Sequence, residues 1–249
     1  MPLDQADGLR RLFGGKRQHI VPLVANPHVA FSSVVLERAT AALVAAGRRP
    51  LLVDAAASAP AAGEMARIDL AACVERLSTE VCYLAARGLP RAYVDTRGSS
   101  AGMLDALADA SAQSDVLLIH AEAADLARMF QRRAARPVLI AADAPDSVKH
   151  AYAATKLLAQ RCRLLTFDLL LAAPPNSPRL RSIASSLAGC ADRFLGGLLH
   201  HWAVVDPASD VHDPTDAGLA RLFAAQLLID DAPALPLPAA AIGSTRYPN

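Results

Sequence analysis

The sequence predicts an α/β fold: a doubly wound, mostly parallel sheet flanked by helices. Short apolar runs of strand length alternate with stretches of helical spacing along most of the 249 residues, and this alternation is typical of parallel sheets. The run at 115–120 is apolar almost throughout, as is usual for a strand buried on both faces. A chain of this length buries a sizeable core as one domain.

The opening unit at 18–54 sets the pattern for the rest of the chain. It consists of an apolar run at 18–25, a polar turn at 26–33, a helical stretch at 34–47 and a second apolar run at 49–54. A strand, a crossover helix and a second strand form a right-handed unit with parallel strands. Folds of this kind hold phosphate at the turn after the first strand, where backbone N–H groups and a helix N-terminus converge.

The turn after this first strand lacks the chemistry of a phosphate loop. It reads Ala-Asn-Pro-His-Val-Ala-Phe-Ser-Ser from Ala25 to Ser33, with neither glycine nor lysine. Phosphate loops use glycine to curl the backbone around the anion and lysine to neutralise it. Pro27 also removes one N–H donor, and Phe31 places a large side chain where a phosphate would lie. We therefore expect poor anion binding at this turn.

The remaining elements follow from the same periodicity. The sequence predicts helices at 68–77, 103–112, 123–133, 148–160, 177–195 and 216–228, and further strands at 91–95, 115–120, 137–142, 167–172 and 198–205.

The two ends of the chain differ from this body. Residues 3–13 have apolar side chains at helical spacing, with acids early and arginines late, which favours a short helix. Residues 231–249 are rich in proline and lack periodicity, which is typical of a loose tail. We therefore divide the chain into an N-terminal helix at 1–15, an α/β domain at 16–230 and a tail at 231–249.

Composition excludes several functional classes. A net charge of +1 without any run of lysine and arginine argues against a nucleic-acid partner. The four cysteines form no CxxC pair, so we expect free thiols in a reducing cytoplasm and no metal site. No apolar stretch reaches the roughly 18 to 20 residues of a membrane span, and the first residues are not a signal peptide. We expect a soluble, cytoplasmic protein without stable membrane association.

Three stretches carry a resemblance to a known family. Asp4-Gln-Ala-Asp-Gly-Leu-Arg10 is similar to a DQAxxLR motif, residues 142–156 resemble PEPTSITDAYAxIK, and residues 41–54 resemble LAxxGxRVLLxDAD. These motifs are those of the MinD/ParA group of P-loop ATPases, and within it of the FlhG-type regulators of flagellar number and placement. The resemblance implies a three-layer, MinD-like sandwich.

The resemblance also implies a partner. In the FlhG group the N-terminal helix engages FlhF, a GTPase of the signal-recognition type. Carried over to this sequence, the partner-binding residues are Asp4, Gln5, Ala6, Leu9 and Arg10. We therefore expect an FlhF-like GTPase, or another flagellar protein, as the partner.

The departures from the family fall on its catalytic positions. When the family's motif GKGGVGKT is aligned with the turn that starts at Asn26, Pro27 takes the position of the signature lysine. Ser32 takes that of the phosphate-binding lysine, and Ser33 that of the magnesium-binding hydroxyl. Only the last of these keeps its chemistry. Phosphoryl transfer depends on positioning and charge neutralisation, so we expect that ATP hydrolysis has been lost.

The other two nucleotide motifs have changed as well. After Asp54 the family's second acid is replaced by Ala56, and the water-orienting DTGAG becomes a stretch that starts at His120. We interpret Asn26, Pro27, Ser32, Ser33, Asp54 and His120 as a vestigial nucleotide loop. The resemblance then implies a pseudo-ATPase without catalytic residues or cofactor and, because the cross-subunit lysine is missing, a monomer.

Two enzyme hypotheses stand as alternatives. One is a working MinD/ParA-type ATPase that binds ATP and magnesium through an aberrant loop. The other is a serine hydrolase, because Gly98-Ser-Ser-Ala-Gly102 matches the G-x-S-x-G nucleophile pattern. Its nucleophile would be Ser100, and its partners would come from Asp143, Asp168, His200, His201 and His212. A ligand pocket near His28 and His120, at the carboxyl edge of the sheet, is a further hypothesis.

Overall fold

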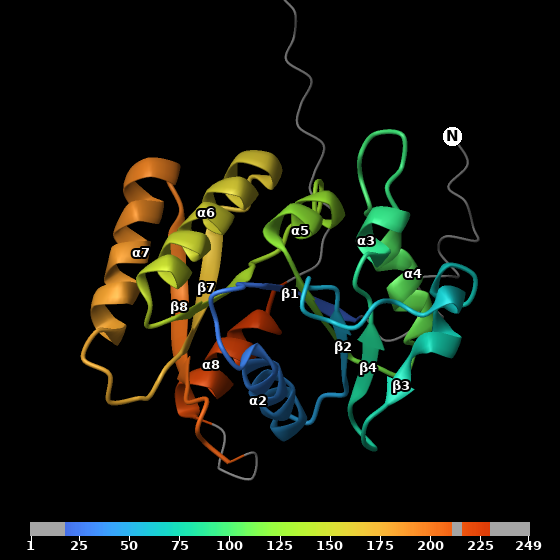
Figure 1. Cartoon of the computed structure of the whole chain (residues 1–249), viewed down its shortest axis with the longest axis horizontal. Helices are drawn as coiled ribbons and strands as arrows, with labels where there is room; N and C mark the ends of the chain where they lie inside the picture. The colour runs from blue at the N-terminus through green and yellow to red at the C-terminus, as the bar shows by residue number, and fades with distance from the viewer. Residues whose placement is uncertain (1–17, 211–215, 230–249) are drawn as a thin grey trace, which may run out of the picture.

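The computed structural model describes residues 18–210 and 216–229, which form one eight-stranded sheet with helices on both faces (Figure 1). The strand order is β3-β4-β2-β5-β1-β6-β7-β8, and every neighbouring pair is parallel except β3 with β4. The strands are β1 (His19–Val24), β2 (Pro50–Asp54), β3 (Glu75–Arg76), β4 (Cys82–Ala85), β5 (Val116–Ala121), β6 (Val138–Ala142), β7 (Thr166–Ala172) and β8 (Leu198–Val205). The predicted doubly wound sheet is confirmed.

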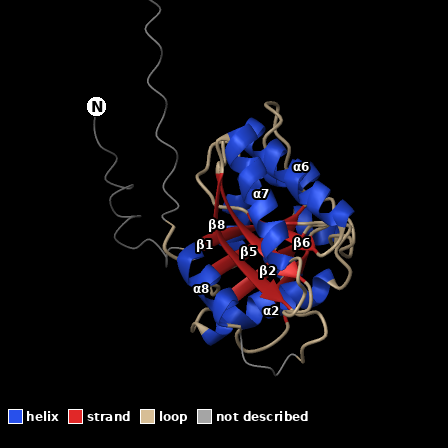
Figure 2. Cartoon of the chain, turned by 90° about the vertical axis from the view of Figure 1, so that its left-hand side faces the viewer, coloured by secondary structure: helices blue, strands red, loops and turns tan. Residues whose placement is uncertain are grey.

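The helices form a layer on each side of the sheet, which makes the three-layer sandwich (Figures 1 and 2). Helices α2 (Ser32–Ala45) and α8 (Ala217–Gln226) pack on one face. The opposite face carries α3 (Leu89–Ala92), α4 (Gly102–Ala110), α5 (Ala123–Met129), α6 (Pro145–Cys162) and α7 (Leu180–Leu195). Each face has its own hydrophobic cluster, so the central strands are apolar on both sides.

Strand β1 shows how the alternation of side chains builds both clusters. Val21 and Leu23 point toward α2, whereas Ile20 and Val24 point into the cluster on the other face. All four are almost fully buried. A strand covered on both faces must be apolar at every position, which is why this run is continuous in the sequence.

In the region between β2 and α4 the structure differs from two of the predicted elements. The strand predicted at 91–95 is wrong, because residues Leu89–Ala92 form the short helix α3. The strand that pairs with β2 is β4 (Cys82–Ala85) instead. Gly88, at a φ of 83°, turns the chain out of β4, and a proline in the first helical turn needs no N–H partner.

The helix predicted at 68–77 is also wrong. This stretch follows the 3-10 turn Glu64–Arg67 and contains only a second 3-10 turn, Ala71–Cys73, and the strand β3. Most of its residues are exposed, so no apolar face holds a longer helix in place. The predicted N-terminal helix at 1–15 and the tail at 231–249 lie outside the described residues.

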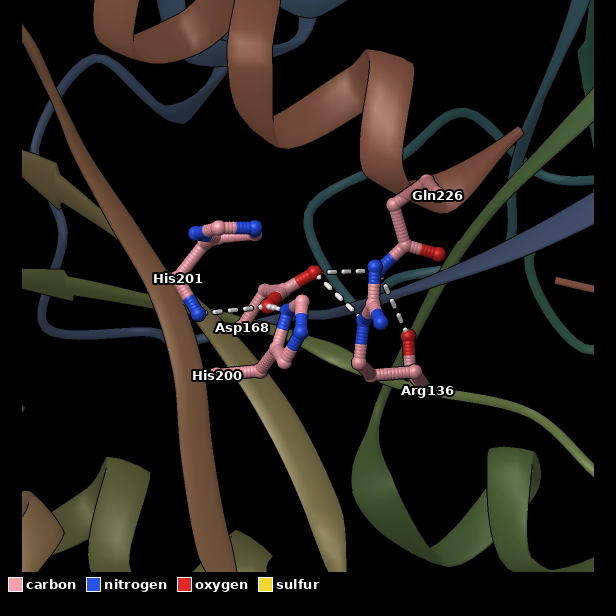
Figure 3. Close-up of polar contacts among 5 residues, drawn as sticks. All are labelled: Arg136, Asp168, His200, His201 and Gln226. Atoms are coloured by element: carbon pink, nitrogen blue, oxygen red, sulfur yellow. Dashed lines mark hydrogen bonds and ion pairs between the residues drawn. The ribbon is translucent and has the colours of Figure 1, made fainter. Parts of the chain in front are cut away.

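A buried ion pair ties the amino edge of the sheet to α8 (Figure 3). The carboxylate of Asp168 on β7 is completely buried and accepts from Nε of Arg136 at 2.8 Å and from Nε2 of Gln226 at 2.7 Å. Its other oxygen accepts from the backbone N–H of His201 on β8 at 2.9 Å. Gln226 also donates to the carbonyl of Arg136 at 2.9 Å. One carboxylate therefore joins two strands, the segment before β6 and the last described helix.

Removal of this carboxylate leaves the Arg136 guanidinium, whose side chain is only 11% exposed, without its countercharge. We expect Asp168→Ala to lower the free energy of unfolding by about 3–5 kcal/mol, because an uncompensated buried charge is far more costly than a lost surface pair. Urea unfolding monitored by circular dichroism measures this. The matched control is Asp192→Ala, an exposed acid on α7, which should change stability by less than about 0.5 kcal/mol. Equal losses in both variants would contradict this account.

Candidate functional site at the turn after β1

The turn between β1 and α2 is held by the side chain of Asn26. This residue is only 5% exposed. Its Nδ2 lies 2.9 Å from the carbonyl oxygen of Ile140 on β6, and 3.0 Å from both the carbonyl oxygen and Oγ of Ser147 on α6. Ser147 Oγ in turn accepts from the N–H of Ala142 at 2.8 Å. The side chain of Asn26 therefore connects the end of β1 to β6 and α6 through hydrogen bonds.

Part of the backbone of the same turn is not available to an anion. Pro27 has none, the N–H of His28 donates to Oδ1 of Asn26, and the N–H of Val29 donates to the carbonyl of Asn26, both at 3.1 Å. A phosphate loop presents several free N–H groups at the corresponding positions. Two N–H groups of the turn are therefore bonded within it, at His28 and Val29.

Helix α2 starts without any of the usual capping features. Phe31, at its N-cap, adopts the left-handed conformation with φ 59° and ψ 34°, and its side chain makes no capping bond. This conformation is uncommon for a bulky residue, and Phe31 is nonetheless 68% exposed. Its ring is therefore held outward beside the start of α2 rather than packed in the core.

Asp54 and His120 form a pair at the ends of β2 and β5. Nδ1 of His120 lies 2.8 Å from Oδ1 of Asp54 and donates to it, because an ionised carboxylate only accepts. The same oxygen accepts from the N–H of Ala56 at 3.3 Å. His120 is 2% exposed, and its Nε2 has no hydrogen-bond partner among the described residues. The carboxylate is thus engaged within the protein.

A cavity of about 580 Å³ lies between α2 and the strands β2 and β4. Its polar lining comes from Ser32, Ser33, Glu37, Thr40, Asp54, Ser58 and Tyr83, and its apolar lining from Leu36, Leu52, Ala59, Pro60, Leu77 and Val81. Burial raises the pKa of Tyr83 above its ordinary value, and the carboxylates of Asp54 and Glu75 raise it further. The cavity is therefore acidic, and no lysine or arginine is among its described lining residues.

A second polar cluster lies on the other side of the turn, between β1 and α6. The rings of His28 and His150 are 5.8 Å apart and meet edge to face. Burial lowers the pKa of His150 and the neighbouring His28 lowers it further, whereas a hydrogen bond to Ala25 and the carboxylate of Glu122 act in the opposite direction. His28 and His120 both lie at the carboxyl edge, but each has a different partner.

The structure brings together only part of the predicted site. Ser32, Ser33 and Asp54 line one cavity, with His120 bonded to Asp54. Asn26 faces away from them, toward β6 and α6, and Pro27 is exposed. Tyr83, Glu37, Ser147 and His150 were missed by the sequence analysis, since no motif marks them and they come from three different elements.

Ser100 is not placed as a nucleophile. Its side chain is completely buried, and Oγ has no hydrogen-bond partner among the described residues. A serine nucleophile needs a base within hydrogen-bond reach, and Asp168, one of its candidate partners, is already bound by Arg136 and Gln226. The serine hydrolase hypothesis has no support in this geometry.

The chain is similar to several proteins of known structure. No family model and no curated protein matches its sequence. The MinC:MinD cell division complex of Aquifex aeolicus matches with a TM-score of 0.58 at 10% identity, over 88% of this chain and 98% of that one. A plasmid partition protein of Borrelia burgdorferi matches with a TM-score of 0.59 at 9% identity, over 85% and 100%.

A third match is cobyrinic acid a,c-diamide synthase of Mycobacterium smegmatis with a bound ATP analogue and magnesium, with a TM-score of 0.59 at 15% identity over 88% and 100% of the two chains. The fold is that of the MinD/ParA-type P-loop ATPases. At these identities the likeness shows the fold alone. No helix of the described residues is long and apolar enough to cross a membrane, and the same residues contain no cluster of three metal-ligating side chains.

We expect Asn26→Ala to lower the free energy of unfolding by about 1–3 kcal/mol, because the buried carbonyl of Ile140 loses its donor. Chemical denaturation measures the loss. The matched control is Ser33→Ala at the start of α2, an exposed residue whose replacement should cost less than about 0.5 kcal/mol. If Asn26→Ala is as stable as the control, the turn is held by something other than this side chain.

Proposed function

We propose that this chain is an FlhG-like regulator of flagellar number that keeps the MinD/ParA fold but no longer hydrolyses ATP. On this proposal it is a monomeric, cytoplasmic protein that needs no cofactor and acts by contact with another protein. The observation that supports the loss of hydrolysis is the turn after β1. Its N–H groups at His28 and Val29 are consumed by Asn26, and Pro27 has none.

Charge supports the same proposal. The triphosphate of ATP is strongly anionic, and MinD/ParA-type enzymes neutralise it with lysines of the loop. Here those lysines are replaced by Pro27 and Ser32, and the adjoining cavity is lined by the acids Glu37 and Asp54. Like charges that are brought together without a countercharge repel each other, so the described residues oppose triphosphate at the place where the fold would hold it.

A working ATPase is the competing proposal, and the fold itself favours it. Ser33 keeps the hydroxyl that holds magnesium in the family, and Asp54 keeps an acid at the end of β2. These two residues line one cavity. Magnesium bound through one or two protein oxygens is typical of phosphate-binding enzymes, so nucleotide binding requires a direct measurement.

Titration of the full chain with magnesium ATP separates the two proposals. We expect no saturable binding by isothermal calorimetry up to about 1 mM and no phosphate release above buffer. The Mycobacterium smegmatis synthase, whose structure contains an ATP analogue and magnesium, is the binding control. Micromolar binding accompanied by turnover would support the working ATPase and overturn the pseudo-enzyme.

The proposed effector is the N-terminal helix with Asp4, Gln5, Ala6, Leu9 and Arg10, which lies outside the described residues. Its assignment rests on the DQAxxLR resemblance and on its place directly before β1. A helix of this length is marginally stable alone, so contact with a partner would stabilise it. The partner of this proposal is an FlhF-like GTPase.

We expect the double variant Gln5→Ala and Leu9→Ala to return the rate of an FlhF-like GTPase from the same host to its unstimulated value, while the circular dichroism spectrum of the variant stays that of the wild type. The reason is that both side chains belong to the proposed contact and neither to the described core. Asp109→Ala, an exposed position on α4, is the control and should stimulate like the wild type. Persistent stimulation by the double variant would exclude the helix as effector.

A further inference from the structure

The face of the sheet that carries α2 and α8 is incompletely covered. Helix α8 packs on β8 and α2, and α2 packs on β2. Beyond α2 the sheet continues with β4 and β3, and within the described part of the chain no further helix lies over them on this face (Figure 1). The cavity of about 580 Å³ lies at this place, between α2 and β4.

This cavity forms a groove that runs along α2. Ser33 and Pro60 line it near the carboxyl edge of the sheet, whereas Leu77 and Val81 line it near the start of β4. Leu77 is 62% exposed, and Val81 and Tyr83 are half-buried. A groove with an apolar floor beside a helix is the kind of surface that an amphipathic helix fills.

The acidic side chains of the groove favour an occupant that carries basic side chains. Glu37 and Asp54 line it, and Glu75 lies close enough to Tyr83 to affect that hydroxyl. No described lining residue is basic. An amphipathic segment with basic side chains and an apolar stripe therefore fits the groove better than an acidic one does.

The chain contains such a segment in its first 17 residues. Leu3, Ala6, Leu9, Leu12 and Phe13 have helical spacing. Within residues 3–13 the acids Asp4 and Asp7 come first and Arg10 and Arg11 follow, and Lys16 and Arg17 add two basic side chains directly after the segment. We propose that residues 3–13 dock into the groove between α2 and β4 of their own chain, with their apolar side chains against Leu77, Val81 and Tyr83.

The tether is long enough for this contact. The first described residue, Gln18, lies at the amino edge of the sheet, where its Nε2 donates to the carbonyls of Ser111 and Ser114 at 2.6 and 3.0 Å. Strand β1 is separated from β4 by β5 and β2, which corresponds to about 14 Å at the usual strand spacing. From Phe13 to Gln18 the chain makes five Cα–Cα steps, which span about 17 Å when extended, so the tether reaches across this distance.

Docking gives the segment two states. In the docked state its apolar side chains are hidden in the groove, and in the released state they are free to contact a partner. This contact would restrain the effector helix until a partner competes for it. The docking itself involves neither nucleotide nor GTPase, although its regulatory meaning rests on the proposed function.

Hydrogen exchange of the full chain, followed by mass spectrometry, tests the docking. We expect the amides of residues 4–13 to exchange at least about 10-fold more slowly than in a synthetic peptide of residues 1–17, because docking protects a helix that is marginal alone. The variant Glu37→Lys with Leu77→Lys places two positive charges in the groove and should bring the exchange to the peptide rate. Both positions are exposed, so the core is left intact.

The matched control is Asp109→Lys with Asp192→Lys, two exposed acids on helices of the opposite face; this control should keep the protection. Exchange of wild-type residues 4–13 at the peptide rate would overturn the docking, as would protection that survives the groove variant. Protection that increases with protein concentration would also overturn it, because a second copy would then supply the helix. The assay contains neither ATP nor a GTPase, so either result is independent of the hydrolysis and partner experiments.

Discussion

The parallel pairing of β1 with β5 and β6 determines where the chemistry of this protein lies. Val24 is in register with Ala121 on one side and with Leu139 on the other. Since parallel strands end at the same edge, the turn after β1, the end of β2 and the end of β5 must lie next to one another. Asp54 and His120 are in register for the same reason, and their side chains form a hydrogen bond.

Doubly wound folds hold phosphate at the turn after the first strand, but the side chains of this turn are engaged with the protein itself. A glycine-rich loop leaves its N–H groups free because no side chain competes for them. Asn26 does the opposite: its Oδ1 takes the N–H of His28 and its Nδ2 reaches across to Ile140 and Ser147. The turn thereby gains rigidity through a side chain rather than through a bound anion, and the buried amide stays satisfied without any ligand.

Long apolar runs made the centre of the fold predictable. The run at 115–120 corresponds to β5 (Val116–Ala121) and the run at 167–172 to β7 (Thr166–Ala172), because strands buried on both faces carry a signal at every position. The edge was not predictable. Strand β4 (Cys82–Ala85) has four residues and α3 (Leu89–Ala92) also has four, too few for any periodicity to be counted.

The same distinction applies to the candidate site. Its position followed from the strand ends, so Asp54, His120 and the turn could be placed at one edge from the sequence. The partners of these residues could not be foreseen. Ser147 and Tyr83 reach the site from α6 and β4, and nothing in their local sequence marks a contact that the tertiary packing alone creates.

The acid at the end of β2 is bonded within the protein, and this bears on whether it could hold a magnesium ion. In a magnesium site Asp54 would have to direct its oxygens at the ion or at its water shell. Here Oδ1 accepts from His120 at 2.8 Å and from Ala56 at 3.3 Å, so an ion would have to compete with both bonds. The loss of the His120 bond would leave a second ring nitrogen of a 2%-exposed imidazole without a partner, and unpaired buried polar groups are costly. The hydrogen bond between Asp54 and His120 therefore opposes magnesium at the acid that resembles the family's own.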